Sequence, residues 1–293
     1  MNPSTLLPSG VHVLERGWLS SNNILFVNGE QTALVDSGYV THSVQTLDLI
    51  GNALRGRVLD RLLNTHLHSD HCGGNAALQS RYPGIRTSIP PGEAKAVAEW
   101  DEEALSYRAT GQECLRFRFD DTLCPGMSVE LAESAWEVHA APGHDPHSVI
   151  LFEAASRTLI SADALWEHGF GVVFPEMLGE PSFDEVAATL DLIEQLSPRT
   201  VIPGHGAVFS FSEEILRNAH ERLEAFVQAP TKHARHALKV LIKFKLLEAR
   251  RLTEAELRSW FVGIPYSVRV QERFFPELTV ELLEQGERPV VPS

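Results

Sequence analysis

Short apolar runs separated by turn residues recur along the chain, and they predict many short β-strands with helices between them. Near the start, three such runs predict neighbouring strands over residues 11–18, 23–27 and 32–36. Asn28-Gly29 between the last two is typical of a two-residue hairpin turn. Later runs predict further strands over residues 58–63, 86–89, 128–131, 136–140, 148–153, 158–163 and 200–202.

Apolar residues at helical spacing predict the elements between these strands. Residues 43–54 carry such a stripe, and 183–196 form a clear amphipathic helix. A helix around 75–82 begins at Asn75, which is a favoured cap residue. We expect one helical stretch over 93–108, which either packs on the surface or forms a lid over a site. Alternating strands and helices of this kind indicate an α/β protein.

The chain changes character after Gln228. Basic residues crowd positions 232–251 and alternate with apolar ones, as in an amphipathic helix with a basic face. Thr253, followed by acidic residues, predicts the start of a second helix. We therefore divide the chain into a larger domain, 1–228, and a helical C-terminal domain, 229–293. The basic face is interpreted as a solvated surface or a homodimer contact, and a track for a phosphate backbone is the alternative.

Composition limits the partners of the protein. The net charge of −14 argues against a chain-wide surface for nucleic acid or for an anionic membrane. Three cysteines, Cys72, Cys114 and Cys124, are too few and too scattered for a disulfide framework. The first ten residues lack the features of a leader peptide, and no apolar run approaches the ~18 residues of a membrane helix. We expect a cytoplasmic protein that binds a small-molecule substrate.

A dense group of metal-binding residue types follows the strand at 58–63. Residues 65–75 read Thr-His-Leu-His-Ser-Asp-His-Cys-Gly-Gly-Asn. In extended backbone, side chains two residues apart point the same way, so His66 and His68 can bind one metal ion. The turn at Ser69 then directs Asp70 and His71 toward a second position. Gly73-Gly74 allows the backbone to fold tightly behind this site.

Three more residues of the same types lie where predicted strands end: His144, Asp163 and His205. Together with the first group they provide seven ligands, a number that fits two metal ions sharing one carboxylate. Asp36 also ends a predicted strand. It is either a solvated turn residue or a partner that orients the metal-binding loop.

In this pattern the chain resembles the metallo-β-lactamase superfamily, and within it the glyoxalase II-like branch, over roughly residues 11–225. The resemblance implies an αββα sandwich with the site at one end of two mixed sheets. It implies two zinc ions, with iron or manganese as alternatives, and an Asp163 that bridges them. The ligand sets implied are His66, His68 and His144 for one metal and Asp70, His71 and His205 for the other. The C-terminal domain is similar to the small winged-helix-like appendage of some members.

The implied reaction is hydrolysis of an ester, thioester or lactone. Two metal ions about 3.5–4 Å apart lower the pKa of a water molecule that attacks the carbonyl, and Asp70 would hold this water and accept its proton. A phosphodiesterase or endoribonuclease and an iron-dependent sulfur dioxygenase are alternatives on the same ligand frame. A non-enzymatic binding protein is a further alternative. The bridging aspartate argues against β-lactam hydrolysis, because the true β-lactamases of this superfamily lack it.

The resemblance also concerns substrate recognition. In glyoxalase II a basic residue and a tyrosine bind glutathione at positions where this chain has Val172 and Phe174. These apolar side chains cannot pair with a carboxylate, so we expect poor recognition of glutathione thioesters. His147, His168 and Trp166 are candidate substrate contacts, and for both histidines packing within the protein is the alternative.

Overall fold

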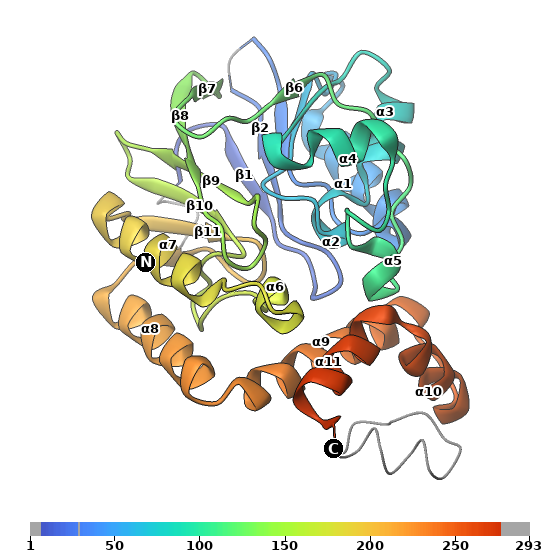
Figure 1. Ribbon diagram of the computed structural model, residues 1–293. Helices are drawn as coiled ribbons and strands as arrows, with labels where there is room; N and C mark the ends of the chain where they lie inside the picture. Colours follow the sequence, from blue (N-terminus) through green and yellow to red (C-terminus); the bar gives the residue numbers. More distant parts are fainter. Residues whose placement is uncertain (1–6, 29, 277–293) are drawn as a thin grey trace.

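The computed structural model describes residues 7–28 and 30–276. Two six-stranded sheets lie face to face, and helices cover the outer face of each sheet (Figure 1). The strand order is β1-β2-β3-β4-β5-β6 in one sheet and β12-β11-β10-β9-β8-β7 in the other. This arrangement is an αββα sandwich, which confirms the predicted fold class.

The first sheet is antiparallel at its beginning and parallel from its third strand onward. Parallel pairing brings the carboxyl ends of adjacent strands to the same edge, and the candidate metal-binding loop leaves the sheet at this edge. The strands are β1 (Val11–Leu14), β2 (Asn23–Phe26), β3 (Ala33–Val35), β4 (Arg61–Leu63), β5 (Arg86–Ile89) and β6 (Asp121–Thr122).

The second sheet is antiparallel except for one parallel pair, β10 with β11. Its strands β9 and β10 are buried along their whole length, because one face meets the first sheet and the other meets helices. The strands are β7 (Ser128–Leu131), β8 (Ser134–Ala140), β9 (Val149–Glu153), β10 (Thr158–Ala162), β11 (Thr200–Pro203) and β12 (Phe209–Ser210).

The predicted two-residue hairpin at Asn28-Gly29 is wrong. Strands β2 and β3 pair antiparallel, but Phe26 pairs with Ala33, so the connection is longer. The Arg57 guanidinium donates hydrogen bonds to the carbonyls of Val27 and Glu30, two residues that a two-residue turn would pair with each other. Gly29 itself lies outside the described residues.

The main core lies between the two sheets. The indole of Trp136 is fully buried there and meets the ring of Phe26 edge-on, with the ring centroids 5.4 Å apart. Aliphatic side chains from the inner faces of both sheets surround this pair. The core therefore fixes the two sheets against each other and so aligns the strand ends that carry the candidate site.

Two amphipathic helices cover each outer face. On the first sheet, α1 (Ser43–Leu54) and α3 (Asn75–Arg81) bury Ile50 and Leu78 against the strands. On the second sheet, α7 (Phe183–Leu196) and α8 (Glu213–Gln228) do the same with Leu190 and Leu223. Helices α1 and α7 have the bounds that the apolar spacing predicted. Three shorter elements are η2 (Val40–His42), α2 (Ser69–Cys72) and α6 (Phe174–Leu178).

The single helix predicted over 93–108 is wrong. The segment forms a 3-10 turn and two short helices, η3 (Pro91–Glu93), α4 (Ala94–Glu99) and α5 (Tyr107–Thr110). Trp100 ends α4 in the left-handed region at φ 61°, where its ring meets Phe117 edge-on. The Asp101 carboxylate then accepts hydrogen bonds from the backbone N–H groups of Glu103 and Ala104, which favours a turn. Leu105 and Tyr107 are buried, so the segment packs against the domain.

Three further helices follow the sandwich: α9 (Pro230–Ala249), α10 (Glu254–Gly263) and α11 (Pro265–Phe274). In Figure 1 they lie below the sheets, and α11 contacts α5 and α6. Thr253 caps α10 as predicted, and Glu256 completes a capping box. Within 229–276, the part of the C-terminal region that the structure describes, these helices are accompanied by no strand. None of the described helices is long and apolar enough to cross a membrane.

Helix α9 docks on the sandwich through its apolar face. Leu238 and Leu241 pack against Val172 and Met177. Farther along the helix, the hydroxyl of Tyr39 donates a hydrogen bond to the Glu248 carboxylate, which also pairs with a lysine of the same helix. The apolar residues of the basic stretch are therefore a packing face, which covers one end of the larger domain.

Because Leu241 is almost fully buried, we expect Leu241→Ala to lower the free energy of unfolding by about 2–5 kcal/mol. Leu247 on the same helix is 40% exposed, so Leu247→Ala is a matched control that should cost well under about 1 kcal/mol. Urea unfolding of both variants measures the difference. Equal losses would contradict the docking of α9 described here.

Candidate metal centre

The loop after β4 is held by backbone hydrogen bonds from two other segments. The N–H groups of Ser21 and Ser37 donate to the carbonyls of Asp70 and His71, at 2.9 and 2.7 Å. The two glycines behind the loop have no room for a side chain, as the sequence indicated. A Cβ on Gly74 would lie 2.4 Å from the carbonyl oxygen of Ser37. The loop is therefore fixed tightly against the end of β3.

Asp36 is the residue that fixes this loop, so the orienting alternative is the one that the structure shows. Its carboxylate accepts hydrogen bonds from the N–H and hydroxyl of Thr65, at 2.9 and 2.7 Å. It also lies 2.8 Å from Nδ1 of His71. An Nδ1–H that donates to this carboxylate leaves Nε2 of His71 free to act as a ligand. Asp36 itself adopts φ 58°, a strained value that these contacts maintain.

Asp163 reaches the centre from the end of β10. Between Ile160 and Ala162 the pairing with β11 shifts register, and Ala162 adopts φ 46°. Such an irregularity directs the following side chain out of the plane of the sheet. The Asp163 carboxylate then lies 3.4 Å from Nε2 of His71 and 3.3 Å from Nε2 of His144. A Cβ on Gly204 would lie 2.2 Å from this carboxylate, so only glycine fits beside it.

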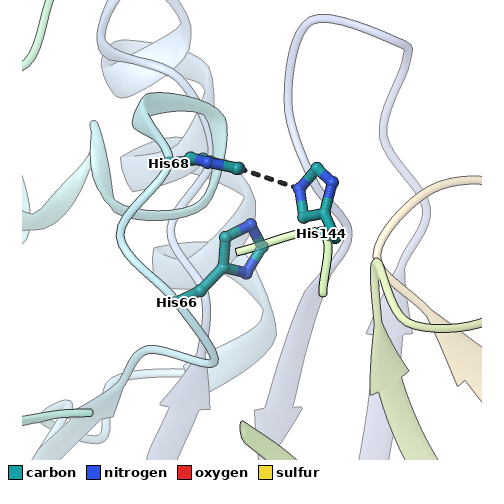
Figure 2. Close-up of side chains that lie close together, drawn as sticks. All are labelled: His66, His68 and His144. Carbon is teal, nitrogen blue, oxygen red and sulfur yellow. Dashed lines mark hydrogen bonds between the residues drawn. The ribbon is translucent and has the colours of Figure 1, made fainter. Parts of the chain in front are cut away.

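His144 comes from the loop after β8 and completes one side of the centre. Its Nδ1 donates to the carbonyl of Val172 at 2.5 Å, which directs Nε2 toward His68. Figure 2 shows the rings of His66, His68 and His144 together, with Nδ1 of His68 2.8 Å from Nε2 of His144. On the other side, Nε2 of His205 lies 3.1 Å from the Asp70 carboxylate.

The structure thus brings together all seven residues that the sequence singled out. Their ligand atoms form three overlapping groups, each with its atoms within 4.8 Å of one another: His66, His68 and His144; His66, His71 and Asp163; and Asp70, His71 and His205. Nε2 of His66 and of His71 are buried without a hydrogen-bond partner among the described residues. Unpartnered imidazole nitrogens that face a carboxylate fit a bound cation.

The protonation states of three of the histidines also suit cation binding, whereas burial is outweighed at His71, where the carboxylates of Asp163, Asp36 and Asp70 raise the pKa, so a cation would displace a proton from that ring. Burial lowers the pKa of His68 and of His144 to about 4, and burial together with the neighbouring His71 lowers that of His66. These rings are neutral near pH 7, which is the form that binds metal. Burial would raise the pKa of Asp163, but His71 and His205 hold it well below its ordinary value, so Asp163 is ionised.

A cavity of about 510 Å³ opens above the cluster. His147, His168 and Trp166 all line it. Trp166 donates from Nε1 to the Asp163 carboxylate at 3.2 Å, and its ring meets His205. The His147 ring packs against Gly92, whereas the His168 side chain is 92% exposed. His147 is therefore packed within the protein and also borders the cavity. His168 lies at the surface, at the edge of the cavity.

The sequence did not reveal the cavity wall that α9 and α11 provide. Val240 and Phe244 of α9 and Tyr266 of α11 line the cavity, and the ring of Tyr266 meets that of Phe174 edge-on. Phe174 contacts the rings of His68 and His144. The position that we compared with a glutathione-binding tyrosine therefore carries an apolar ring beside the candidate metal centre. The only sequence signal for this wall was the apolar face of 230–249, whose partner could not be identified without the fold.

The family model described as the Metallo-beta-lactamase superfamily matches residues 16–205. The chain belongs to this superfamily, and it is a metal-dependent hydrolase. The chain is similar to a Hydroxyacylglutathione hydrolase of Thermosynechococcus vestitus. The two sequences are 26% identical over 222 residues, which cover 75% of this chain and 74% of the relative. The predicted superfamily and its glyoxalase II-like branch are thereby confirmed.

Two solved structures resemble the whole fold or its larger part. A metallo-beta-lactamase family protein from Thermus thermophilus is 20% identical, with a TM-score of 0.63, covering 94% of this chain and 95% of that one. TTHA1623, solved in a di-iron-bound form, is 25% identical with a TM-score of 0.56, covering 71% of this chain and 96% of that one. The first match extends over the C-terminal helices as well as the sandwich.

Because Asp36 orients His71 and Thr65, we expect Asp36→Asn to weaken metal binding by about 10–100-fold while the fold is retained. Metal content after dialysis against a graded chelator measures this change. Asp60→Asn is the matched control, since Asp60 accepts comparable hydrogen bonds from Thr32 away from the centre. Wild-type metal retention in Asp36→Asn would refute the orienting role.

Proposed function

We propose that the chain hydrolyses a carboxylic ester or thioester at a dinuclear metal centre, with zinc as the metal. One ion would be held by His66, His68 and His144, and the other by Asp70, His71 and His205. Asp163 would be a ligand of both ions. The observation that supports this most strongly is the pair of unpartnered buried nitrogens, on His66 and His71, whose residues form one ligand group with the Asp163 carboxylate. Two bound metal ions would lower the pKa of a water molecule and polarise a carbonyl oxygen of the substrate.

The residues of this chain supply the remaining requirements of the reaction. Asp70 is partly exposed to the cavity and held ionised by His71 and His205, which lower its pKa although burial opposes them. Its carboxylate is placed to orient the attacking water and to accept a proton from it. Trp166 fixes Asp163 by its hydrogen bond and shields it from one side. Phe174 excludes water beside His68 and His144.

The similarity to a Hydroxyacylglutathione hydrolase supports thioester chemistry for this chain. Zinc and iron both suit a centre of histidine and carboxylate ligands, and TTHA1623 was solved with two iron ions. Metal analysis of the purified protein, combined with a screen of thioesters, esters and lactones, tests the metal and the reaction together. Activity confined to phosphodiesters, or oxygen consumption with a persulfide, would overturn the proposal.

Wild-type protein should bind two metal ions per chain, and Asp163→Ala should lose at least one of them together with nearly all activity. The reason is that the Asp163 carboxylate approaches histidines of both ligand groups. Elemental analysis and initial rates measure the two effects. Asp191→Ala, on the exposed side of α7, is the control. A single metal ion that survives Asp163→Ala with full activity would disprove the shared role of this carboxylate.

Lactoyl thioesters of small thiols that carry a carboxylate should be hydrolysed with a higher kcat/KM than S-lactoylglutathione. At the positions compared with the glutathione contacts, the Val172 carbonyl binds His144 and its side chain packs in an apolar cluster, while Phe174 presents an apolar ring. Neither side chain can donate to a glutathione carboxylate. Steady-state kinetics with the same acyl group on each thiol make the comparison. A clear preference for the glutathione thioester would show that other residues recognise this thiol.

A further inference from the structure

The cavity extends from the metal-ligand cluster to two cationic or polar side chains that the proposed reaction does not use. Arg222 of α8 and His236 of α9 both line it, together with Trp166 and His168 from the loop after β10. The Arg222 guanidinium donates to Nε2 of His236 at 3.2 Å. A neutral imidazole is the form that accepts this bond, and burial together with Arg222 lowers the pKa of His236.

Packing holds the Arg222 side chain in one orientation. Its guanidinium carbon lies 5.8 Å from the ring centroid of Phe170 and 5.1 Å from that of Phe226. Its aliphatic stem passes over Gly169, where an added Cβ would lie 2.7 Å from Cδ. Gly169 pairs with Trp166, which contacts Asp163. Arg222 is thus connected by rigid contacts to the metal-ligand cluster, which favours precise placement of a ligand group.

Among residues 7–28 and 30–276, no acidic side chain balances the charge of Arg222. No carboxylate of the described residues forms an ion pair with it, whereas Arg269, another arginine of the cavity wall, lies 3.7 Å from Glu103. Its Nε is buried and has no acceptor in the part of the chain that the structure describes. A partly buried guanidinium without an anion is costly, and a bound carboxylate or phosphate removes this cost through charge-assisted hydrogen bonds.

We propose that Arg222, supported by His236, binds an anionic group of the substrate, so that the enzyme selects esters or thioesters carrying a carboxylate or phosphate away from the reacting bond. This inference rests on the proposed hydrolase function. The carbonyl lies at the metal-ligand cluster, and the intervening part of the substrate passes the apolar side chains of Phe174, Val240 and Phe244. The anion contact is therefore on α8 and α9, and not at Val172 and Phe174.

The test uses acetyl thioesters of mercaptobutanol, mercaptobutanoate and mercaptobutyl phosphate, and a second pair with and without a terminal carboxylate on the acyl group. The metal-loaded wild type is compared with Arg222→Met, which keeps an apolar stem against Phe170 and Phe226. Arg217→Met is the matched control, because Arg217 lies on the same helix in an exposed pair with Glu221. Circular dichroism and the rate with the neutral thioester verify that each variant is folded.

We expect wild type to prefer at least one anionic thioester, and Arg222→Met to lower kcat/KM for that compound about 10–100-fold relative to the neutral one. Arg222→Lys should restore part of the preference, and Arg217→Met should leave it unchanged. The carboxylate and phosphate compounds identify which anion is bound. No preference in wild type, or an equal loss for neutral and anionic compounds in Arg222→Met, would overturn the inference and leave Arg222 a packing residue.

A binding measurement separates this inference from the proposed reaction. Thioether analogues of the same compounds cannot be hydrolysed, and calorimetry gives their dissociation constants. If no thioester is hydrolysed but the anionic thioethers bind about 10–100-fold more weakly to Arg222→Met than to wild type, the anion site stands and the proposed reaction fails. If thioesters are hydrolysed but anionic and neutral thioethers bind alike, the reaction stands and the anion site fails.

Discussion

The Asp36 carboxylate is the constraint on which the site depends. It ends a strand of the first sheet and accepts three hydrogen bonds from the loop that carries His66 to His71. One of these bonds sets the ring of His71, so the same side chain fixes both the path of the loop and the direction of a ligand atom. The unusual φ of Asp36 shows that the backbone accepts strain to make this arrangement.

The other half of the centre depends on the second sheet in a comparable way. Asp163 and His205 follow the parallel strands β10 and β11, and the register shift before Asp163 turns its carboxylate toward the histidines of the first sheet. The interior that Trp136 and Phe26 fill keeps the two sheets in fixed relation. A site shared between two sheets thus obtains its geometry from the packing of the interior as well as from its own hydrogen bonds.

Local chemistry explains which features the sequence could predict. Helices α1 and α7 have strong apolar periodicity, and the seven clustered residues lie at strand ends, so both could be recognised along the chain. The turn after Phe26 could not, because Arg57 binds the carbonyls that an Asn-Gly hairpin would pair. Trp100 ends a helix through a contact with Phe117, a residue distant in sequence. Such contacts depend on the tertiary fold and override local preference.

The position of α9 and α11 in the chain determines when their wall of the cavity forms during synthesis. These helices follow the sandwich in the chain, so they leave the ribosome after it. Until α9 docks, Val172 and Met177 lack their partners on it, and Tyr39 lacks the carboxylate of Glu248. The nascent enzyme therefore carries an apolar surface next to its metal-ligand cluster, and the cavity has its full wall only after α9 and α11 have docked.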